Sequence, residues 1–251
     1  SEGMKERYPD IFFSQFTGAE LVADKWNLSR EDLDQFALES HQKAAQATES
    51  KYFDKEILPV EGKNAEGIND LVMADEGIRF DASLDKLAGL NPVTEGGKIT
   101  AGNASQITDG AAAVLICNDA GLKKIKSNPR AEIVSISVVG DDPVFMLTGP
   151  IPASHKALDI AKLSIDDMDI YEVNEAFAPV PLAWAEELKA DRSKLNVNGG
   201  AMALGHPLGA TGAKLMTTML HELERRKGKY ALQAICEGGG TANATIIKRV
   251  S

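Results

Sequence analysis

The sequence is short of cysteine, of basic residues and of long apolar runs, and each shortage excludes a class of protein. Two cysteines, Cys117 and Cys236, are too few for a disulfide framework in 251 residues, so we expect a reducing compartment, the cytoplasm. No apolar run approaches the roughly 18 residues that a membrane-spanning helix needs. Basic residues number 27 against 37 acidic ones, and a formal net charge of −10 disfavours non-specific binding to nucleic acid.

What remains is the composition of an ordinary globular protein. Hydrophobic residues make up 43% of the chain and charged residues 25%, which shows no bias toward disorder. The length allows one large domain or two modest ones, each with its own core. The first residues, SEGMKERYPD, hold no secretory signal and do not begin with methionine, so we expect a cut edge there.

The first hundred residues predict helix followed by irregular structure. From Leu21 to Ser50 apolar residues recur every three to four positions, and Ser29 with Asp32 three residues later is typical of a capped helix start. Residues 51–100 mix Gly, Pro, Asn and charges, which indicates loops, brief strands and one short helix.

From residue 107 onward the pattern alternates between strand and helix. The segment DGAAAVLICND predicts a small-residue helix or a buried strand, with Cys117 in the core, and AEIVSISVVG predicts a strand buried on both faces. Further strands are predicted at 169–174, 194–198, 230–236 and 241–250, with helices between them at 154–163, 175–188 and 206–227. This βαβαβαββ order predicts an α/β fold with a mixed, mostly parallel sheet, and chemistry in such sheets lies beyond the strand ends.

Three loops after successive predicted strands carry Asn174, His206 and Cys236. Each has an ordinary structural explanation: a helix cap, a turn histidine satisfied by backbone, and a small buried hydrophobe. Together they favour a site, because the glycines around His206 allow close approach of a ligand and the EGGG after Cys236 offers backbone amides to an oxyanion. A thiol beside such amides and a histidine is expected to have a depressed pKa.

Four motifs in order resemble those of the thiolases. VNEAFA at 173–178, NVNGGAMALGHPLGATGAK at 196–214 and CEGGGTANATI at 236–246 are similar to the three C-terminal motifs of that family, and TAGNASQITDGAAAVL at 100–115 is similar to its coenzyme A loop. The spacings fit thiolases better than ketoacyl synthases, and NEAF differs from the tetrapeptide of the sterol-carrier-protein type. The resemblance implies a 3-ketoacyl-CoA thiolase, an acyltransferase of fatty acid or sterol side-chain degradation, which cleaves 3-ketoacyl-CoA with coenzyme A (CoA) or runs the reverse condensation.

The resemblance also implies the catalytic roles. His206 would activate a nucleophilic cysteine and donate to the thioester oxygen, while Asn174 would hold a water of the same oxyanion site, which Glu175 orders. Cys236 would exchange a proton with the α-carbon, and the Gly238 amide would help to form a second oxyanion hole.

For coenzyme A, the resemblance assigns contacts to three residues. Ser105 and Arg79 would contact the cofactor-like substrate, Arg79 near its nucleotide, and Phe177 would lie beside the pantetheine channel. We expect no cofactor besides CoA and acyl-CoA as substrates. His155 and His221 are read as ordinary helix residues, and no pair of histidines has metal-ligand spacing, so we expect no metal.

The resemblance places the family's nucleophilic cysteine well before residue 1, so the chain is interpreted as a C-terminal portion that lacks the N-terminal half. The expected organisation is a loop domain at 1–106, a remnant of the N-terminal half at 107–130 and the C-terminal thiolase domain at 131–251. The expected partners are the missing half and, at full length, further copies in a dimer or tetramer. The alternative is a non-catalytic binding or assembly module with the same fold.

Overall fold

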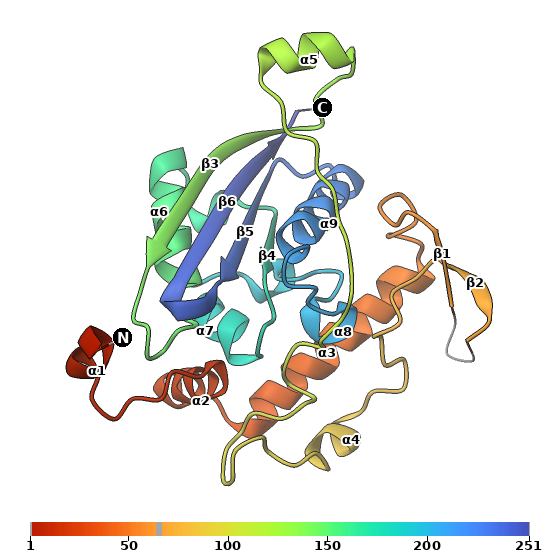
Figure 1. Cartoon of the computed structure of the whole chain (residues 1–251). Coiled ribbons are helices and arrows are strands. Elements are labelled where there is room, and N and C mark those ends of the chain that lie inside the picture. Colours follow the sequence, from red (N-terminus) through yellow and green to blue (C-terminus); the bar gives the residue numbers. More distant parts are fainter. Residues whose placement is uncertain (1, 64–66, 251) are drawn as a thin grey trace.

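The computed structural model describes residues 2–63 and 67–250, and its centre is a four-stranded sheet (Figure 1). The strands lie in the order β3-β6-β5-β4, with β3 at Ala131–Gly140, β4 at Ile170–Val173, β5 at Tyr230–Cys236 and β6 at Thr241–Arg249. The α/β class with a mixed sheet is confirmed. Of these ladders, β4–β5 is parallel and both ladders of β6 are antiparallel, so the described sheet is not mostly parallel as predicted.

The strand expected at 194–198 is reduced to isolated bridges, one between Tyr171 and Leu195 and one between Val197 and Gly199. The physical reason lies in Asn196, whose side-chain amide donates to Val173 O and whose Oδ1 accepts from Val173 N, both at 2.9 Å. One side chain thus takes the place of a neighbouring strand beside β4.

Helices cover both faces of the sheet. Helix α6 (Pro150–Ala161) and helix α7 (Pro179–Leu188) lie on one face, and helix α9 (Thr211–Arg226) lies on the other (Figure 1). Leu232 and Ile246 belong to the core cluster that includes residues of α6 and α7, whereas Ala231 and Ile247 belong to the cluster that includes residues of α9. The two prolines of α7 lie in its first turn, as predicted, where a missing N–H costs no helical hydrogen bond.

Strand β3 is an edge strand with one face open, contrary to the prediction that both faces are buried. Ile136 is 56% exposed and Val138 61%, while Ser135 and Ser137 on the other face donate to main-chain oxygens of α6. Helix α9 covers β4 and β5 and reaches little of β6 and β3. Ile136 and Val138 of β3 are therefore not covered by this helix.

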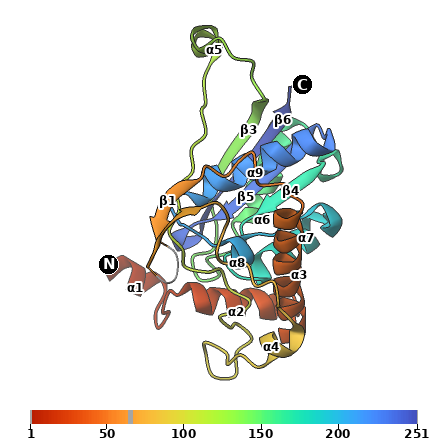
Figure 2. The same ribbon diagram turned by 90° about the vertical axis from the view of Figure 1, so that its right-hand side faces the viewer.

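The helical N-terminal part packs beside the sheet (Figure 2). Helix α2 (Gln15–Lys25) contacts α7, and α3 (Arg30–Glu49) contacts the short helix α8 (Ala201–Leu204). The predicted capping box is confirmed, because Ser29 Oγ accepts from Asp32 N at 3.1 Å and Ser29 N donates to Asp32 Oδ2 at 2.8 Å. Short elements complete this part: α1 (Glu2–Arg7), β1 (Val60–Lys63), β2 (Asn69–Val72) and α4 (Leu84–Ala88). Among the described residues, no helix is both long and apolar enough to cross a membrane.

Residues 107–118 form neither the helix nor the buried strand predicted for them. They run as an extended segment past α9 to helix α5 (Asp119–Ile125), which projects from the body (Figures 1 and 2). Leu115 is 76% exposed and Ile116 68%, and Cys117 is exposed, so the prediction that Cys117 is a core residue is wrong. An apolar run becomes a buried strand only beside a partner strand, and within 2–63 and 67–250 none pairs with this segment.

Candidate active site

Asn174 and His206 meet at the end of β4. Asn174 is the first residue after the strand, and its main-chain N–H continues the ladder by donating to Ala234 O at 3.0 Å. Its side-chain Nδ2 lies 3.4 Å from His206 Nε2, and Asn174 is 1% exposed. Two of the three predicted loops therefore place their polar side chains together at the carboxyl end of a strand, as expected for an α/β site.

Thr211 sets the tautomer of His206. Thr211 Oγ1 lies 2.6 Å from His206 Nδ1 and 3.0 Å from Pro207 O. Its single hydroxyl proton must go to the carbonyl, which has no proton to offer, so Thr211 Oγ1 accepts from His206 Nδ1–H. The Nε2 lone pair then faces Asn174 Nδ2. Burial lowers the pKa of His206, which favours this neutral imidazole.

The loop that carries His206 depends on a glycine. Gly205 has a φ of +81°, and a Cβ there would lie 2.4 Å from Thr108 Oγ1. The glycine-rich stretch therefore allows the segment at 108 to pack directly against the residue before His206.

Cys236 ends β5, the strand beside β4, and is 8% exposed. Its side chain belongs to the core cluster that includes Ala176 and Phe177, and no hydrogen bond in the described part of the chain joins its thiol to Asn174 or His206. Burial raises the pKa of Cys236 to about 12, so the expected depression is wrong: desolvation outweighs the backbone contribution. The group is a protonated thiol at neutral pH.

Glu175 lies beneath the site as a buried carboxyl. It is 1% exposed and accepts from Ser40 Oγ at 2.7 Å, Asn196 Nδ2 at 2.9 Å and Met202 N at 3.1 Å. Burial raises its pKa although these hydrogen bonds oppose the shift. It connects α3, the end of β4 and α8, so it orders the elements around the histidine loop.

Gly238 begins a short turn (Gly238–Gly240) that follows β5 after Glu237; Gly238 and Gly239 are exposed, and Gly240 is buried. A Cβ there would meet no heavy atom within 4 Å, so the turn is open to a ligand. Its predicted place in a second oxyanion hole stays a prediction.

Arg79 lines a pocket of about 280 Å³ with Lys86, Gln106 and Met202. Its main-chain N–H donates to His41 Nδ1 at 3.1 Å, and burial together with the Arg79 charge lowers the pKa of His41. No sequence pattern distinguishes His41, a lone histidine on a helix, from an ordinary core residue. A guanidinium can form charge-assisted hydrogen bonds with phosphate, and the contact of Arg79 with the nucleotide of CoA stays a prediction.

The other two predicted CoA residues lie deeper. Ser105 is half-buried, and its N–H donates to Ala176 O at 2.9 Å. Phe177 is 3% exposed, and its ring meets that of Phe16 edge to face at 5.4 Å. A bridge between Ala104 and Phe177 joins the two segments, and the contact of Phe177 with pantetheine stays a prediction.

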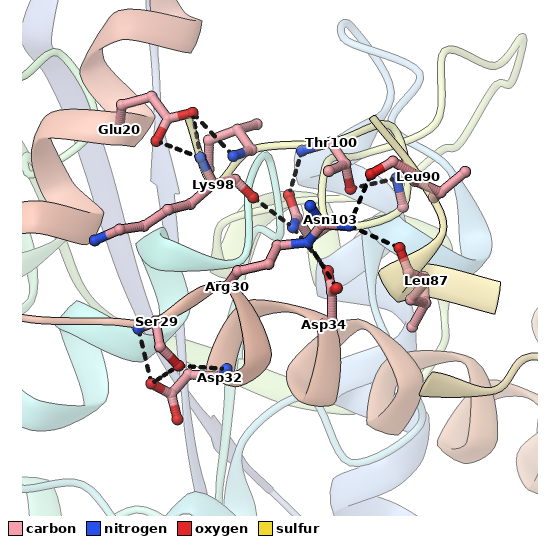
Figure 3. A network of polar contacts seen from close by, with 12 residues as sticks. Glu20, Ser29, Arg30, Asp32, Asp34, Leu87, Leu90, Lys98, Thr100 and Asn103 are labelled. Atoms are coloured by element: carbon pink, nitrogen blue, oxygen red, sulfur yellow. Dashed lines mark hydrogen bonds and ion pairs between the residues drawn. The ribbon is translucent and has the colours of Figure 1, made fainter. Parts of the chain in front are cut away.

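A polar network fixes the segment that leads to Ser105 (Figure 3). Asn103 is fully buried; its Nδ2 donates to Asp34 Oδ1 at 2.9 Å, and its Oδ1 accepts from Thr100 N at 2.8 Å. Asp34 also accepts from Arg30 Nε at 2.7 Å, and Glu20 accepts from the main chain of Lys98. Helices α2 and α3 thus determine where residues 98–103 lie.

His155 is exposed on α6, and His221 is half-buried on α9, where Glu56 raises its pKa. Within the described ranges no three His, Cys, Asp or Glu side chains form a group suited to a metal.

Comparison with known proteins supplies the family. The thiolase N-terminal domain family matches residues 2–120, and the thiolase C-terminal domain family matches residues 127–249. The chain belongs to the thiolase family. Because residues matching both domain families are present, the prediction that the chain lacks the N-terminal half is wrong as stated.

Individual relatives agree. The chain is 56% identical over 244 residues to a steroid 3-ketoacyl-CoA thiolase of Mycobacterium tuberculosis, covering 97% of this chain and 58% of that protein. It is 43% identical to the acetyl-CoA acetyltransferase of Paracoccus denitrificans, covering 99% and 63%. The crystal structure of human mitochondrial 3-ketoacyl-CoA thiolase in complex with CoA is similar at a TM-score of 0.86 and 44% identity, covering 93% and 58%. The chain thus spans less than two thirds of the length of these relatives.

Proposed function

We propose that this chain carries the acid–base site of a 3-ketoacyl-CoA thiolase, with CoA and 3-ketoacyl-CoA as its substrates. One observation carries the proposal: a neutral His206 with its Nε2 lone pair directed at a buried Asn174, its tautomer set by Thr211. This is the arrangement of a general base beside a polar group that can hold a water in an oxyanion site.

The protonated Cys236 fits the cleavage direction. When a thiolate adds to the β-carbonyl of 3-ketoacyl-CoA and the Cα–Cβ bond breaks, the electron pair passes to the α-carbon as an enolate, which takes a proton. A buried thiol with a pKa of about 12 is such a proton donor, and the resulting thiolate is returned to the thiol when CoA loses its proton. In condensation the same group has to act as a base.

The acylated nucleophile is neither cysteine of the chain. Cys117 is exposed on the extended segment before α5, and Cys236 is assigned to proton transfer. We therefore propose that thiolysis needs a thiol other than those of Cys117 and Cys236. Strand β3, whose open face carries the exposed Ile136 and Val138, offers apolar surface to a packing partner, and a self-sufficient binding module would not be expected to expose it.

The substrate class, the compartment and the oligomeric state can be proposed only in general terms. A steroid 3-ketoacyl-CoA thiolase and an acetyl-CoA acetyltransferase are both relatives, so fatty acyl and sterol side-chain substrates are both candidates. We propose a cytoplasmic enzyme that works as a homo-oligomer without a resident cofactor.

The deciding experiment follows the α-protons of acetyl-CoA in D₂O by NMR, a reaction that needs the acid–base pair and no acylated cysteine. We expect exchange above the buffer rate, reduced at least about 10-fold by His206→Asn and by Cys236→Ala. Cys117→Ala is the matched control and should leave the rate unchanged. Binding of CoA with no exchange above buffer would instead support the non-catalytic module.

A further inference from the structure

Gln106 makes hydrogen bonds to two segments that are distant in the sequence. Its side-chain Nε2 donates to Gly77 O at 2.8 Å and to Met202 O at 2.7 Å. Its main-chain oxygen accepts from His206 N at 3.0 Å, and its own N–H donates to Ala201 O at 3.4 Å. One residue therefore contacts the segment that leads to Arg79, helix α8 and the main chain of His206.

The amide of Gln106 is closely packed against the segment at Gly77. A Cβ at Gly77 would lie 2.7 Å from Ala203 O and 2.9 Å from Gln106 Oε1, so the glycine allows the segment at 77 to approach the amide directly. Gln106 also lines the pocket of about 280 Å³ that contains Arg79 and His41. Movement of the Arg79 segment would therefore have to move the Gln106 amide or break its bond.

The other side of Gln106 is held in place. The segment before it is fixed through Asn103, whose main-chain oxygen accepts from Ala178 N at 2.9 Å, and Ser105 N donates to Ala176 O at 2.9 Å. The backbone before Gln106 is held by hydrogen bonds to the residues after β4. A displacement of the Gln106 side chain would therefore move the two groups that it contacts, the Met202 carbonyl and the His206 N–H.

We propose that Gln106 is a positioning residue that couples the Arg79 pocket to the backbone of His206. Both amide protons of its side chain are used on carbonyls of the two segments, and its main chain completes the connection to the histidine. The part of the inference that names CoA as the occupant of the pocket rests on the proposed function. The part that concerns the position of His206 does not.

The test removes the two donors without changing the size of the side chain. Gln106→Met keeps the volume and leaves Gly77 O and Met202 O without their donor. The matched control is Gln35→Met, because Gln35 lies exposed on α3 and its amide donates to Glu39 on the same helix, at 3.0 Å. The readout is the set of imidazole ¹⁵N and ¹³C signals of His206 in the 251-residue chain, assigned by their loss in His206→Asn.

We expect Gln106→Met to shift the His206 imidazole signals and their pH titration, and Gln35→Met to leave both as in the unchanged chain. In a second arm, CoA should shift the His206 signals of the unchanged chain, bind Gln106→Met at least about 5-fold more weakly, and no longer shift those signals in the variant. If Gln106→Met fails to fold, Gln106→Asn, which is too short to reach both carbonyls, provides the same comparison.

Unchanged His206 signals in the folded variant would overturn the inference, whatever CoA does. Failure of CoA to bind the unchanged chain would count against the proposed function alone, and the first arm would still decide the role of Gln106. Retained coupling of CoA to His206 in the variant would also contradict the inference.

Discussion

His206 Nδ1 lies 2.6 Å from Thr211 Oγ1, and this contact determines which nitrogen of the imidazole can act as a base. Thr211 occupies the first turn of α9, and its hydroxyl also donates to Pro207 O, one residue after the histidine. The start of α9 therefore orients the imidazole of His206 through the Thr211 hydroxyl. The positive φ of Gly205 sets the backbone conformation before His206.

Thr211→Val should abolish this arrangement while keeping the shape of the side chain. Without the hydroxyl, Nδ1–H has no acceptor, and the proton can move to Nε2, which then no longer offers a lone pair. We expect the rate of acetyl-CoA proton exchange to fall about 10- to 100-fold, and the ¹⁵N shifts of His206 to show a mixture of tautomers.

Thr211→Ser is the matched control, since it keeps the hydroxyl. It should retain the Nδ1–H tautomer and most of the exchange rate. A valine variant with an unchanged tautomer would show that Asn174, and not Thr211, orients the ring.

Part of this site could be predicted from the sequence because the carboxyl ends of neighbouring strands in an α/β sheet bring the residues that follow them together. Asn174 and His206 were selected from their position at strand ends, and the structure brings them to 3.4 Å. The contact of Thr211 with His206 could not be predicted, although both lie in the stretch GHPLGATG, because hydroxyls in first helical turns are common caps.

The failures have a shared physical cause, which is that burial depends on neighbours the local pattern does not contain. The β-branched run of β3 and the small-residue run ending at Cys117 read as core, yet Val138 and Cys117 are exposed. The expected lowering of the pKa of Cys236 was also wrong. Nearby amides and a histidine would favour a thiolate, but burial of the side chain has the larger effect and raises the pKa. Gln106 and His41 could not be found, because their partners lie far away in the sequence.

Glu172 should make stability depend on pH. It is 1% exposed on β4, its Oε1 has no hydrogen-bond partner in the described structure, and burial, with Glu175 nearby, raises its pKa well above the ordinary 4.5. The folded chain therefore keeps a proton that the unfolded chain releases above about pH 4.5, and stability falls as pH rises through the window up to the folded pKa.

Glu172→Gln replaces the protonated acid by a neutral group of the same shape. We expect little change in the free energy of unfolding near pH 4.5, and an advantage for the variant that grows by up to about 1.4 kcal/mol per pH unit within the window. Urea titrations at pH 5, 6.5 and 8 measure it. A constant difference between the two proteins at all three values would show that Glu172 is ionised in the folded chain.

Arg79→Ala should discriminate between CoA and its form without the 3′-phosphate. A charge-assisted contact to phosphate is strong, so loss of the guanidinium should weaken CoA about 10-fold and dephospho-CoA about 2-fold or less in calorimetric titrations. Arg192→Ala is the matched control, because that arginine is exposed and lies 3.6 Å from Glu39, away from the pocket. Equal weakening of both ligands would place the 3′-phosphate elsewhere.

The 251-residue chain should show no thiolysis of acetoacetyl-CoA above background, even where it exchanges the α-protons of acetyl-CoA. Thiolysis needs a thiol that becomes acylated, and the covalent step divides one high barrier into two. Cys236 is a poor substitute, since its buried thiol is protonated and its assigned approach is to the α-carbon. Cys117 is exposed and lies on the segment that leads to α5.

The measurement is loss of the acetoacetyl-CoA enolate absorbance in the presence of CoA, for the unchanged chain, Cys117→Ala and Cys236→Ala. Absence of turnover in all three, together with proton exchange that is lost in Cys236→Ala and kept in Cys117→Ala, would separate the acid–base role from the nucleophilic one. Because the members of a cysteine–histidine unit act together, loss of the nucleophile removes nearly all of the thiolysis rate. Turnover that survives Cys117→Ala and disappears in Cys236→Ala would make Cys236 the nucleophile, and the roles proposed for Cys236 and His206 would have to be exchanged for those of a direct acyl-transfer pair.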